Sequence, residues 1–153
     1  MVCMGNICRS PTAEAVLQAK LRAAGLHPQV EVDSAGTHNF HPGSPPDPRS
    51  QRHAARRGYD LSRQRARQVK TRDFERFDLI LAMDHENLDG LMEICPHFAR
   101  DRVGLLMAHA RSSTSRVVPD PYVGGPAGFE EVLDLVEDAC DGLLDHLRRA
   151  LGR

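Results

Sequence analysis

The stretch Met1-Val2-Cys3-Met4-Gly5-Asn6-Ile7-Cys8-Arg9-Ser10-Pro11 decides the fold and the chemistry of this 153-residue chain. Five residues separate Cys3 from Arg9, and helical periodicity begins directly after them. Backbone N–H groups between a thiol and a guanidinium can all point at one anion, so the pattern is typical of an anion-binding loop. A helix N-terminus behind the loop adds partial positive charge, which favours a thiolate. Gly5 and Asn6 are the residue types that most easily adopt a positive φ, so we expect the backbone to curve there.

Length and composition predict a single domain over residues 1–153, long enough to bury a sizeable core. Hydrophobic residues make up 41% and charged residues 27%, and the net charge of −1 argues against a general nucleic-acid binder. No apolar run approaches the 18 residues typical of a membrane helix, so we expect no membrane partner. The four cysteines have no disulfide-framework spacing, which favours a reducing cytoplasm.

Hydrophobic periodicity predicts strands that alternate with helices along the chain. We expect helices over 11–24, 49–57, 85–94 and a last one whose apolar stripe runs from 129 to 147, a helical turn at 71–74, strands over 30–34, 78–83 and 103–107, and irregular loops over 38–48 and 117–125. This alternation predicts an α/β fold with a parallel sheet, helices on both faces, and ligands at the carboxyl ends of the strands.

Two helix starts and one strand have specific consequences. Ser10 is expected to cap the first helix, with Pro11 at its first position. Asp84 can cap the helix that follows residues 78–83, pair with Arg9, or do both. The first strand should precede Cys3, yet only two residues stand there, whereas strands usually have about 5–6. We therefore expect this strand to be largely truncated and the natural chain to start upstream.

A thiolate and an arginine fork suit phosphoryl transfer, which also needs an acid for the leaving oxygen, supplied from another loop. Asp120-Pro121-Tyr122, in a Pro/Gly-rich segment, is the candidate. Its tyrosine could stack on an aryl substrate. The alternative interpretation is that the Asp-Pro pair marks only a turn.

With these motifs together, the chain resembles the low-molecular-weight protein tyrosine phosphatases over almost its whole length. Residues 2–11 match the family signature nearly throughout. Further matches in order and spacing are Asp33-Ser34-Ala35-Gly36-Thr37, Pro46-Asp47-Pro48-Arg49, Ala66-Arg67-Gln68, Phe77-Asp78 with Met83-Asp84, and Asp120-Pro121-Tyr122. The resemblance implies a three-layer α/β fold with a four-stranded parallel sheet of order 2-1-3-4. It also implies hydrolysis of phosphotyrosine and small aryl phosphates through a phosphocysteine, without metal or cofactor.

The resemblance also implies roles for individual residues. Cys3 would be the nucleophile, Arg9 would bind the phosphoryl oxygens, and Asp120 would be the acid and then the base. Residues implied to bind substrate or to wall the pocket are Met4, Gly5, Asn6, Ile7, Cys8, Phe40 and Tyr122. Residues implied to support the loop are Ser10 at the sulfur of Cys3, Ser34 as partner of Asn6, Gln64, and Asp84 behind Arg9.

Three positions separate this chain from other members. Gln64 stands where the family commonly has a histidine; an amide can still donate and accept. Val123 follows Tyr122 where many eukaryotic members have a second tyrosine, which favours bacterial-type membership. Cys8 is either a small packing residue or the partner of Cys3 in a reversible, protective disulfide.

The expected partner is a tyrosine-phosphorylated protein, such as a bacterial tyrosine kinase, and the expected state is a monomer or weak dimer. One alternative is an arsenate reductase on the same fold, which needs a relay of two further cysteines. Cys95 and Cys140 stand far apart and are expected to be core thiols instead. Another is a non-catalytic phosphotyrosine-binding module, which should lack Cys3 or Asp120. A zinc site from Cys3, Cys8 and a histidine lacks a completing motif, so His38, His41 and His53 are expected to be solvated.

Overall fold

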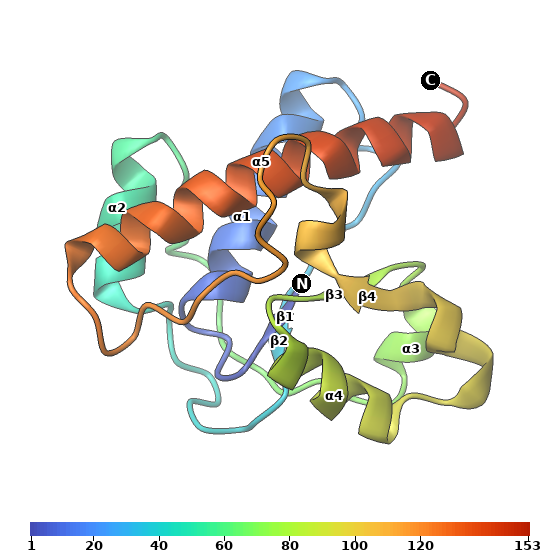
Figure 1. The fold of residues 1–153 in the computed structure, drawn as a ribbon, viewed down its shortest axis with the longest axis horizontal. Helices are drawn as coiled ribbons and strands as arrows, with labels where there is room; N and C mark the ends of the chain where they lie inside the picture. The colour runs from blue at the N-terminus through green and yellow to red at the C-terminus, as the bar shows by residue number, and fades with distance from the viewer.

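Four short parallel strands form the centre of the molecule, in the order β2-β1-β3-β4 (Figure 1). The computed structural model describes residues 1–153. The strands are β1 Val2–Cys3, β2 Ala35–Gly36, β3 Ile80–Ala82 and β4 Val103–Leu105. The predicted sheet order and the short first strand are both confirmed.

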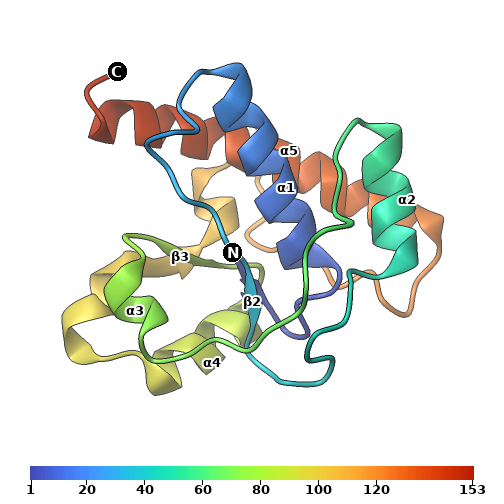
Figure 2. The ribbon, with the colours of Figure 1, turned by 180° about the vertical axis from the view of Figure 1, so that it is seen from behind.

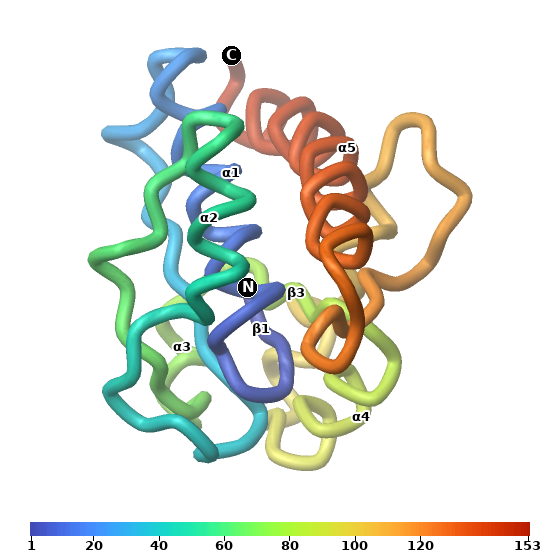
Figure 3. Tube along the Cα trace, turned by 90° about the vertical axis from the view of Figure 1, so that its left-hand side faces the viewer, coloured from blue at the N-terminus to red at the C-terminus, as the bar shows by residue number.

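Helices cover both faces of this sheet (Figures 1, 2 and 3). They are α1 Arg9–Ala23, α2 Pro48–Arg56, α3 Asp73–Arg76, α4 His85–Ile94 and α5 Pro126–Ala150, with 3₁₀ turns η1 His97–Arg102 and η2 Leu106–His109. One apolar cluster lies between the sheet and α1 and α5; a smaller one lies between the sheet and α3 and α4. This confirms the three-layer α/β arrangement. No helix is both long and apolar enough to cross a bilayer.

The strand predicted over residues 30–34 is wrong, because strand β2 begins only at Ala35. The pairing of Val2 with Ala35 sets a parallel register that places Met1 opposite Ser34. On the N-terminal side of Ser34, the segment's one backbone hydrogen bond to residues 1–3 is from the Met1 amine to the Asp33 carbonyl, at 3.0 Å. Alternating sequence forms a strand only where another backbone lies beside it, and residues 30–32 have none.

The predicted cap at Ser10 is also wrong. Helix α1 begins at Arg9, and its N-cap, Cys8, makes no side-chain capping bond. The expected cap at Asp84 is present, since its carboxylate accepts from the backbone N–H of Asn87 at the start of α4. Aspartate is a favoured cap because its carboxylate satisfies an otherwise unpaired N–H and suits the positive helix end.

The fold brings the functional segments to one edge of the sheet. Cys3 ends β1, and Asp84 lies two residues beyond the end of β3. The loop of residues 117–125 joins them because the N–H of Val118 donates to the carbonyl of Met83 at 2.7 Å. The carboxyl ends of parallel strands meet at the same edge, so the predicted position of the site is the observed one.

Close packing between α5 and η2 leads to a stability prediction. A Cβ at Gly142 would lie 1.6 Å from the carbonyl oxygen of His109, which is backbone and cannot rotate away. We expect Gly142→Ala to destabilise the fold by roughly 1–3 kcal/mol, despite alanine's helix propensity, because the helix must shift. Urea denaturation measures this change.

Gly128→Ala, in the same helix, is the matched control. Its Cβ would lie 3.5 Å from Pro121 Cβ, an ordinary contact. We expect its free energy of unfolding to be unchanged or higher by up to about 1 kcal/mol. Equal stability of the two variants would refute the close packing at Gly142.

Candidate active site

The loop from Cys3 to Arg9 turns at Asn6, whose φ of 58° is the only positive value at a non-glycine residue. The prediction for Asn6 is therefore confirmed, whereas the one for Gly5 is wrong, since its φ is not positive. Gly5 is instead restricted by space: a Cβ there would lie 3.3 Å from the ring of His41.

The backbone of this loop separates its carbonyls from its N–H groups. Three carbonyls accept backbone bonds from the surrounding loops. These bonds join Thr37 to Cys3, His38 to Met4, and Asp47 to Ile7. The N–H groups of residues 5–8 donate to no protein acceptor. Four free N–H donors in a tight turn form an anion-binding concavity.

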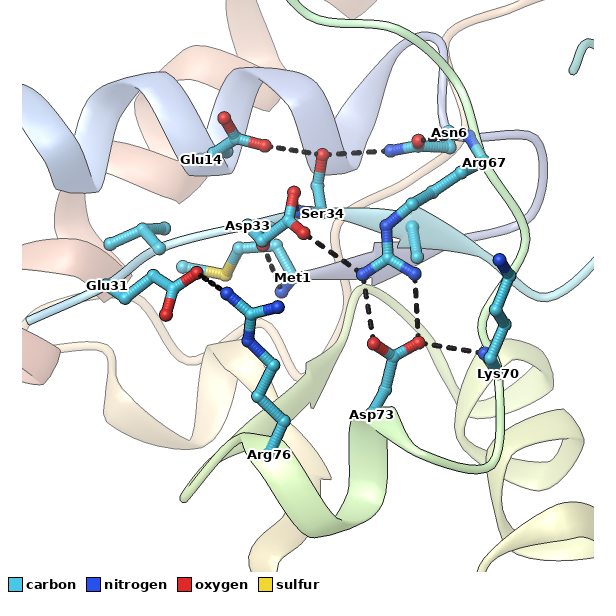
Figure 4. Close-up of polar contacts among 12 residues, drawn as sticks. Met1, Asn6, Glu14, Glu31, Asp33, Ser34, Arg67, Lys70, Asp73 and Arg76 are labelled. Carbon is cyan, nitrogen blue, oxygen red and sulfur yellow. Dashed lines mark hydrogen bonds and ion pairs between the residues drawn. The ribbon is translucent and has the colours of Figure 1, made fainter. Parts of the chain in front are cut away.

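The side chain of Asn6 points away from this concavity into a buried network (Figure 4). Its amide donates to the hydroxyls of Ser10 at 2.9 Å and Ser34 at 3.0 Å. Its carbonyl oxygen accepts from the N–H of Arg67 at 3.1 Å. The Ser34 hydroxyl in turn donates to Glu14 at 2.7 Å. Asn6 therefore fixes the loop's shape from behind, and its side chain does not wall the pocket.

Ser10 lies at the nucleophile, as predicted from the resemblance. Its Oγ is 3.0 Å from the sulfur of buried Cys3. Because the amide of Asn6 already fills one acceptor position on this hydroxyl, its proton is free for the sulfur or for the Ala35 carbonyl, 3.4 Å away. The Ser10 hydroxyl therefore does not cap helix α1 and contacts the Cys3 sulfur instead.

Gln64 does not contact Asn6 directly but lies beside Ser34, the partner of Asn6. Its amide donates to the carbonyl of Pro11 at 2.9 Å, and its oxygen lies 3.4 Å from the Ser34 hydroxyl. Ser34 has one proton, and Glu14 is the closer acceptor. The sequence offered no signal for Glu14, because a glutamate in a helix usually faces solvent. Burial raises the pKa of Glu14, while the hydroxyl of Ser34 opposes the shift.

Arg9 is 2% exposed and held from behind by two acceptors. One terminal nitrogen donates to Asp84 at 2.6 Å and to the Val118 carbonyl at 2.9 Å. The other terminal nitrogen lies 3.8 Å from the carboxylate of Asp120, too far for a hydrogen bond. Asp84 thus both caps α4 and pairs with Arg9, and the two predicted roles coexist.

A pocket of about 250 Å³ opens over the loop and brings the predicted residues together. It is lined by Cys3, Met4, Gly5, Ile7, Cys8, Arg9, Phe40, His41, Asp120 and Tyr122. Phe40 stacks on His38, with ring centroids 4.8 Å apart. His41, predicted to be solvated, was missed as a wall of the pocket because its proline-rich loop has no periodicity that would place it.

The remaining cysteines do not form a relay with Cys3. All four cysteines are free and buried. Cys95 and Cys140 belong to apolar clusters on opposite faces of the sheet. Burial raises the pKa of Cys8 and of Cys140 to about 12, so both are protonated thiols at neutral pH. The arrangement disfavours the arsenate reductase alternative.

Comparisons with known proteins agree with this geometry. The profile of the family "Low molecular weight phosphotyrosine protein phosphatase" matches residues 1–152. A low molecular weight protein-tyrosine-phosphatase of Streptomyces coelicolor is 46% identical, over 96% of this chain and 91% of that protein. The crystal structure of a protein tyrosine phosphatase from Entamoeba histolytica superposes with a TM-score of 0.95 at 38% identity, covering 97% of this chain and 95% of the other.

A more distant structure contains a ligand. Vibrio vulnificus Wzb in complex with benzylphosphonate superposes with a TM-score of 0.82 at 29% identity, covering 95% of this chain and 94% of the other. The match of the family profile extends over nearly the entire sequence. The chain therefore belongs to the low molecular weight phosphotyrosine protein phosphatase family and is a cysteine-dependent protein-tyrosine phosphatase.

Proposed function

We propose that Cys3, Arg9 and Asp120 hydrolyse phosphotyrosine in two steps within a single phosphatase domain over residues 1–153. The observation that carries the proposal is their convergence on one pocket, beside the free N–H groups of residues 5–8. A nucleophile, an anion cradle and an acid within one cavity are what phosphoryl transfer requires.

In the first step the thiolate of Cys3 attacks phosphorus, and a sulfur–phosphorus bond forms while the bond to the tyrosine oxygen breaks. Protonated Asp120 gives its proton to the departing oxygen. In the second step water attacks phosphorus, its proton passes to the Asp120 carboxylate, and the sulfur–phosphorus bond breaks. Inorganic phosphate and the Cys3 thiolate are the products, so no metal or cofactor takes part.

Arg9 and the loop amides stabilise the charge of the transition state. The guanidinium is held rigidly by Asp84 and the Val118 carbonyl, so it loses little freedom when it binds two phosphoryl oxygens. Donors fixed before the reaction begins are more effective than donors that must reorient.

Aromatic walls select the aryl group. Phe40 and Tyr122 line the pocket while 61% and 48% exposed, so they can accept a ring that enters from solvent. The benzylphosphonate bound to Vibrio vulnificus Wzb combines an aromatic ring with tetrahedral phosphorus. A tyrosine-phosphorylated protein is the proposed substrate, with a bacterial tyrosine kinase as one candidate, and four free cysteines fit a cytoplasmic location.

Kinetic assays on two aryl phosphates test the roles of Cys3 and Asp120. We expect Cys3→Ser to abolish turnover, because a neutral hydroxyl is a far weaker nucleophile. Asp120→Asn should lower kcat/KM on phenyl phosphate by about 10²–10⁴-fold, and much less on 4-nitrophenyl phosphate, whose leaving oxygen needs little protonation. Asp101→Asn, an exposed carboxylate without an ion pair, is the control. Loss of parent activity in EDTA would contradict the mechanism.

Titration of Glu14 should reduce stability as the pH rises. Since burial raises its pKa, the folded chain keeps this proton at a pH where the unfolded chain has released it. The free energy of unfolding therefore falls with pH from about 4.3 up to the raised pKa, and the lost stability is not regained above it. Glu14→Gln removes this dependence, so its stability relative to the parent should grow over that interval.

Denaturation at several pH values measures the Glu14 effect. Glu131→Gln, at an exposed position of α5, is the matched control and should show a constant difference from the parent. A constant difference for Glu14→Gln as well would contradict the inference that this buried carboxyl titrates upon unfolding.

Cys8 is proposed to protect the nucleophile during oxidation. Peroxide converts the Cys3 thiolate to a sulfenic acid, and attack by the Cys8 sulfur would form a disulfide and release water. Because burial raises the pKa of Cys8 to about 12, protection should be faster in mildly alkaline buffer. Dithiothreitol should then restore activity to the peroxide-treated parent but not to Cys8→Ser. Equal recovery would assign Cys8 to packing alone.

A further inference from the structure

The segment Pro46-Asp47-Pro48-Arg49 contacts both the phosphate-binding loop and Tyr122, yet the proposed mechanism gives it no role. The N–H of Asp47 donates to the carbonyl of Ile7, in the phosphate-binding loop, at 2.8 Å. The buried carboxylate of Asp47 accepts from the N–H of Arg49 and caps helix α2. Asp47 is therefore fixed to the nucleophile's loop.

Asp47 in turn holds the side chain of Arg49. The Arg49 guanidinium donates through two nitrogens to the two carboxylate oxygens, at 3.1 and 2.9 Å. This fork holds the pKa of Asp47 below its usual range. A bidentate pair fixes the plane of the guanidinium as well as its position.

The fixed guanidinium contacts two aromatic rings. Its carbon lies 5.4 Å from the ring centroid of Tyr122 and 4.8 Å from that of Phe129. Phe129 is buried in the first turns of α5, whereas Tyr122 belongs to the acid loop, which we define as residues 119–125. Arginine over an aromatic face is attracted by the partial negative charge of the ring's π face.

The acid loop makes few other polar contacts, although Pro121 is buried and Asp120 lies 3.8 Å from Arg9. The residue directly before the loop, Val118, is hydrogen-bonded to Met83 and to Arg9. Beyond it, the loop's hydrogen bonds are internal, from Tyr122 N–H to Asp120 and from Gly124 N–H to Pro121, and none reaches α2. Val123 is 95% exposed. The stack of Arg49 on Tyr122 is a cation–π contact between this loop and α2, and no hydrogen bond joins the two.

We propose that Arg49 is a positioning residue that holds Asp120 over the leaving oxygen by fixing the ring of Tyr122. Because the N–H of Tyr122 donates to the Asp120 carboxylate at 3.0 Å, a displaced Tyr122 displaces the acid. Arg49 therefore assists the proton transfer to the departing oxygen and makes no contact with the Cys3 thiolate. This inference rests on the proposed function of the same site.

The experiment compares kcat/KM, which reports the first step, for phenyl phosphate and 4-nitrophenyl phosphate in the parent, Arg49→Met and Arg49→Lys. We expect Arg49→Met to lower kcat/KM about tenfold on phenyl phosphate, equivalent to ~1.4 kcal/mol, and less than about threefold on 4-nitrophenyl phosphate. Lysine keeps the charge without the planar fork, so it should recover only part of the loss. Arg111→Met is the control, since Arg111 makes a two-nitrogen contact with Asp145 and touches no ring.

A double variant separates positioning from general structural damage. With Asp120→Asn already present there is no acid to position, so Arg49→Met should cause no further loss on phenyl phosphate. Equal losses on both substrates, or a further loss in the Asp120→Asn background, would overturn the inference. If Arg49→Met does not fold, Tyr122→Leu removes the same stack and leaves the Asp47 fork intact, with the same substrate-dependent loss expected.

The two proposals fail in different ways. A parent protein that hydrolyses neither aryl phosphate refutes the proposed function. A parent that hydrolyses both through Cys3 and Asp120, with an unchanged ratio of the two kcat/KM values in Arg49→Met, refutes only the role of Arg49.

Discussion

The left-handed backbone of Asn6 is the constraint on which the active site depends. A non-glycine residue in this conformation costs roughly 1–2 kcal/mol, and it persists only where its surroundings fix it. Here the side-chain amide bonds Ser10, Ser34 and the N–H of Arg67, which come from three separate segments of the chain. The Ser10 hydroxyl that receives Asn6 also contacts the sulfur of Cys3. The shape of the loop and the environment of the Cys3 thiol therefore depend on the same side chain.

A second constraint is the buried charge of Arg9. A guanidinium removed from water needs a carboxylate and further acceptors, and Asp84 and the Val118 carbonyl supply them. The Asp84 carboxylate also caps α4, and this second hydrogen bond fixes its position beside Arg9. One buried side chain thus aligns the start of α1, the end of β3 and the beginning of the acid loop.

Local periodicity predicted the main helices, and the motifs predicted that Cys3, Arg9 and Asp120 would lie together. The sheet order came only from the resemblance to the family. The sequence did not predict Glu14, since only the packing of the Ser34 segment against α1 makes that helix position buried. Residues 30–34 have the alternation of a strand, but pairing also requires a neighbouring backbone. Ser10 is the right residue type for a cap, yet its hydroxyl is bonded to the active site instead. Each error concerns a contact between segments that local patterns do not encode.

The separation along the chain of the residues that line the pocket has a consequence for synthesis. Arg9 bonds Asp84 and Val118 across 75 and 109 positions. Closing such long loops is slow, and a ribosome releases the N-terminal segment first. For most of its translation the nascent chain carries Cys3 without the acid loop and without the carbonyl that orients Arg9. The complete pocket therefore forms late in synthesis, when the C-terminal third has emerged and α5 can pack against α1.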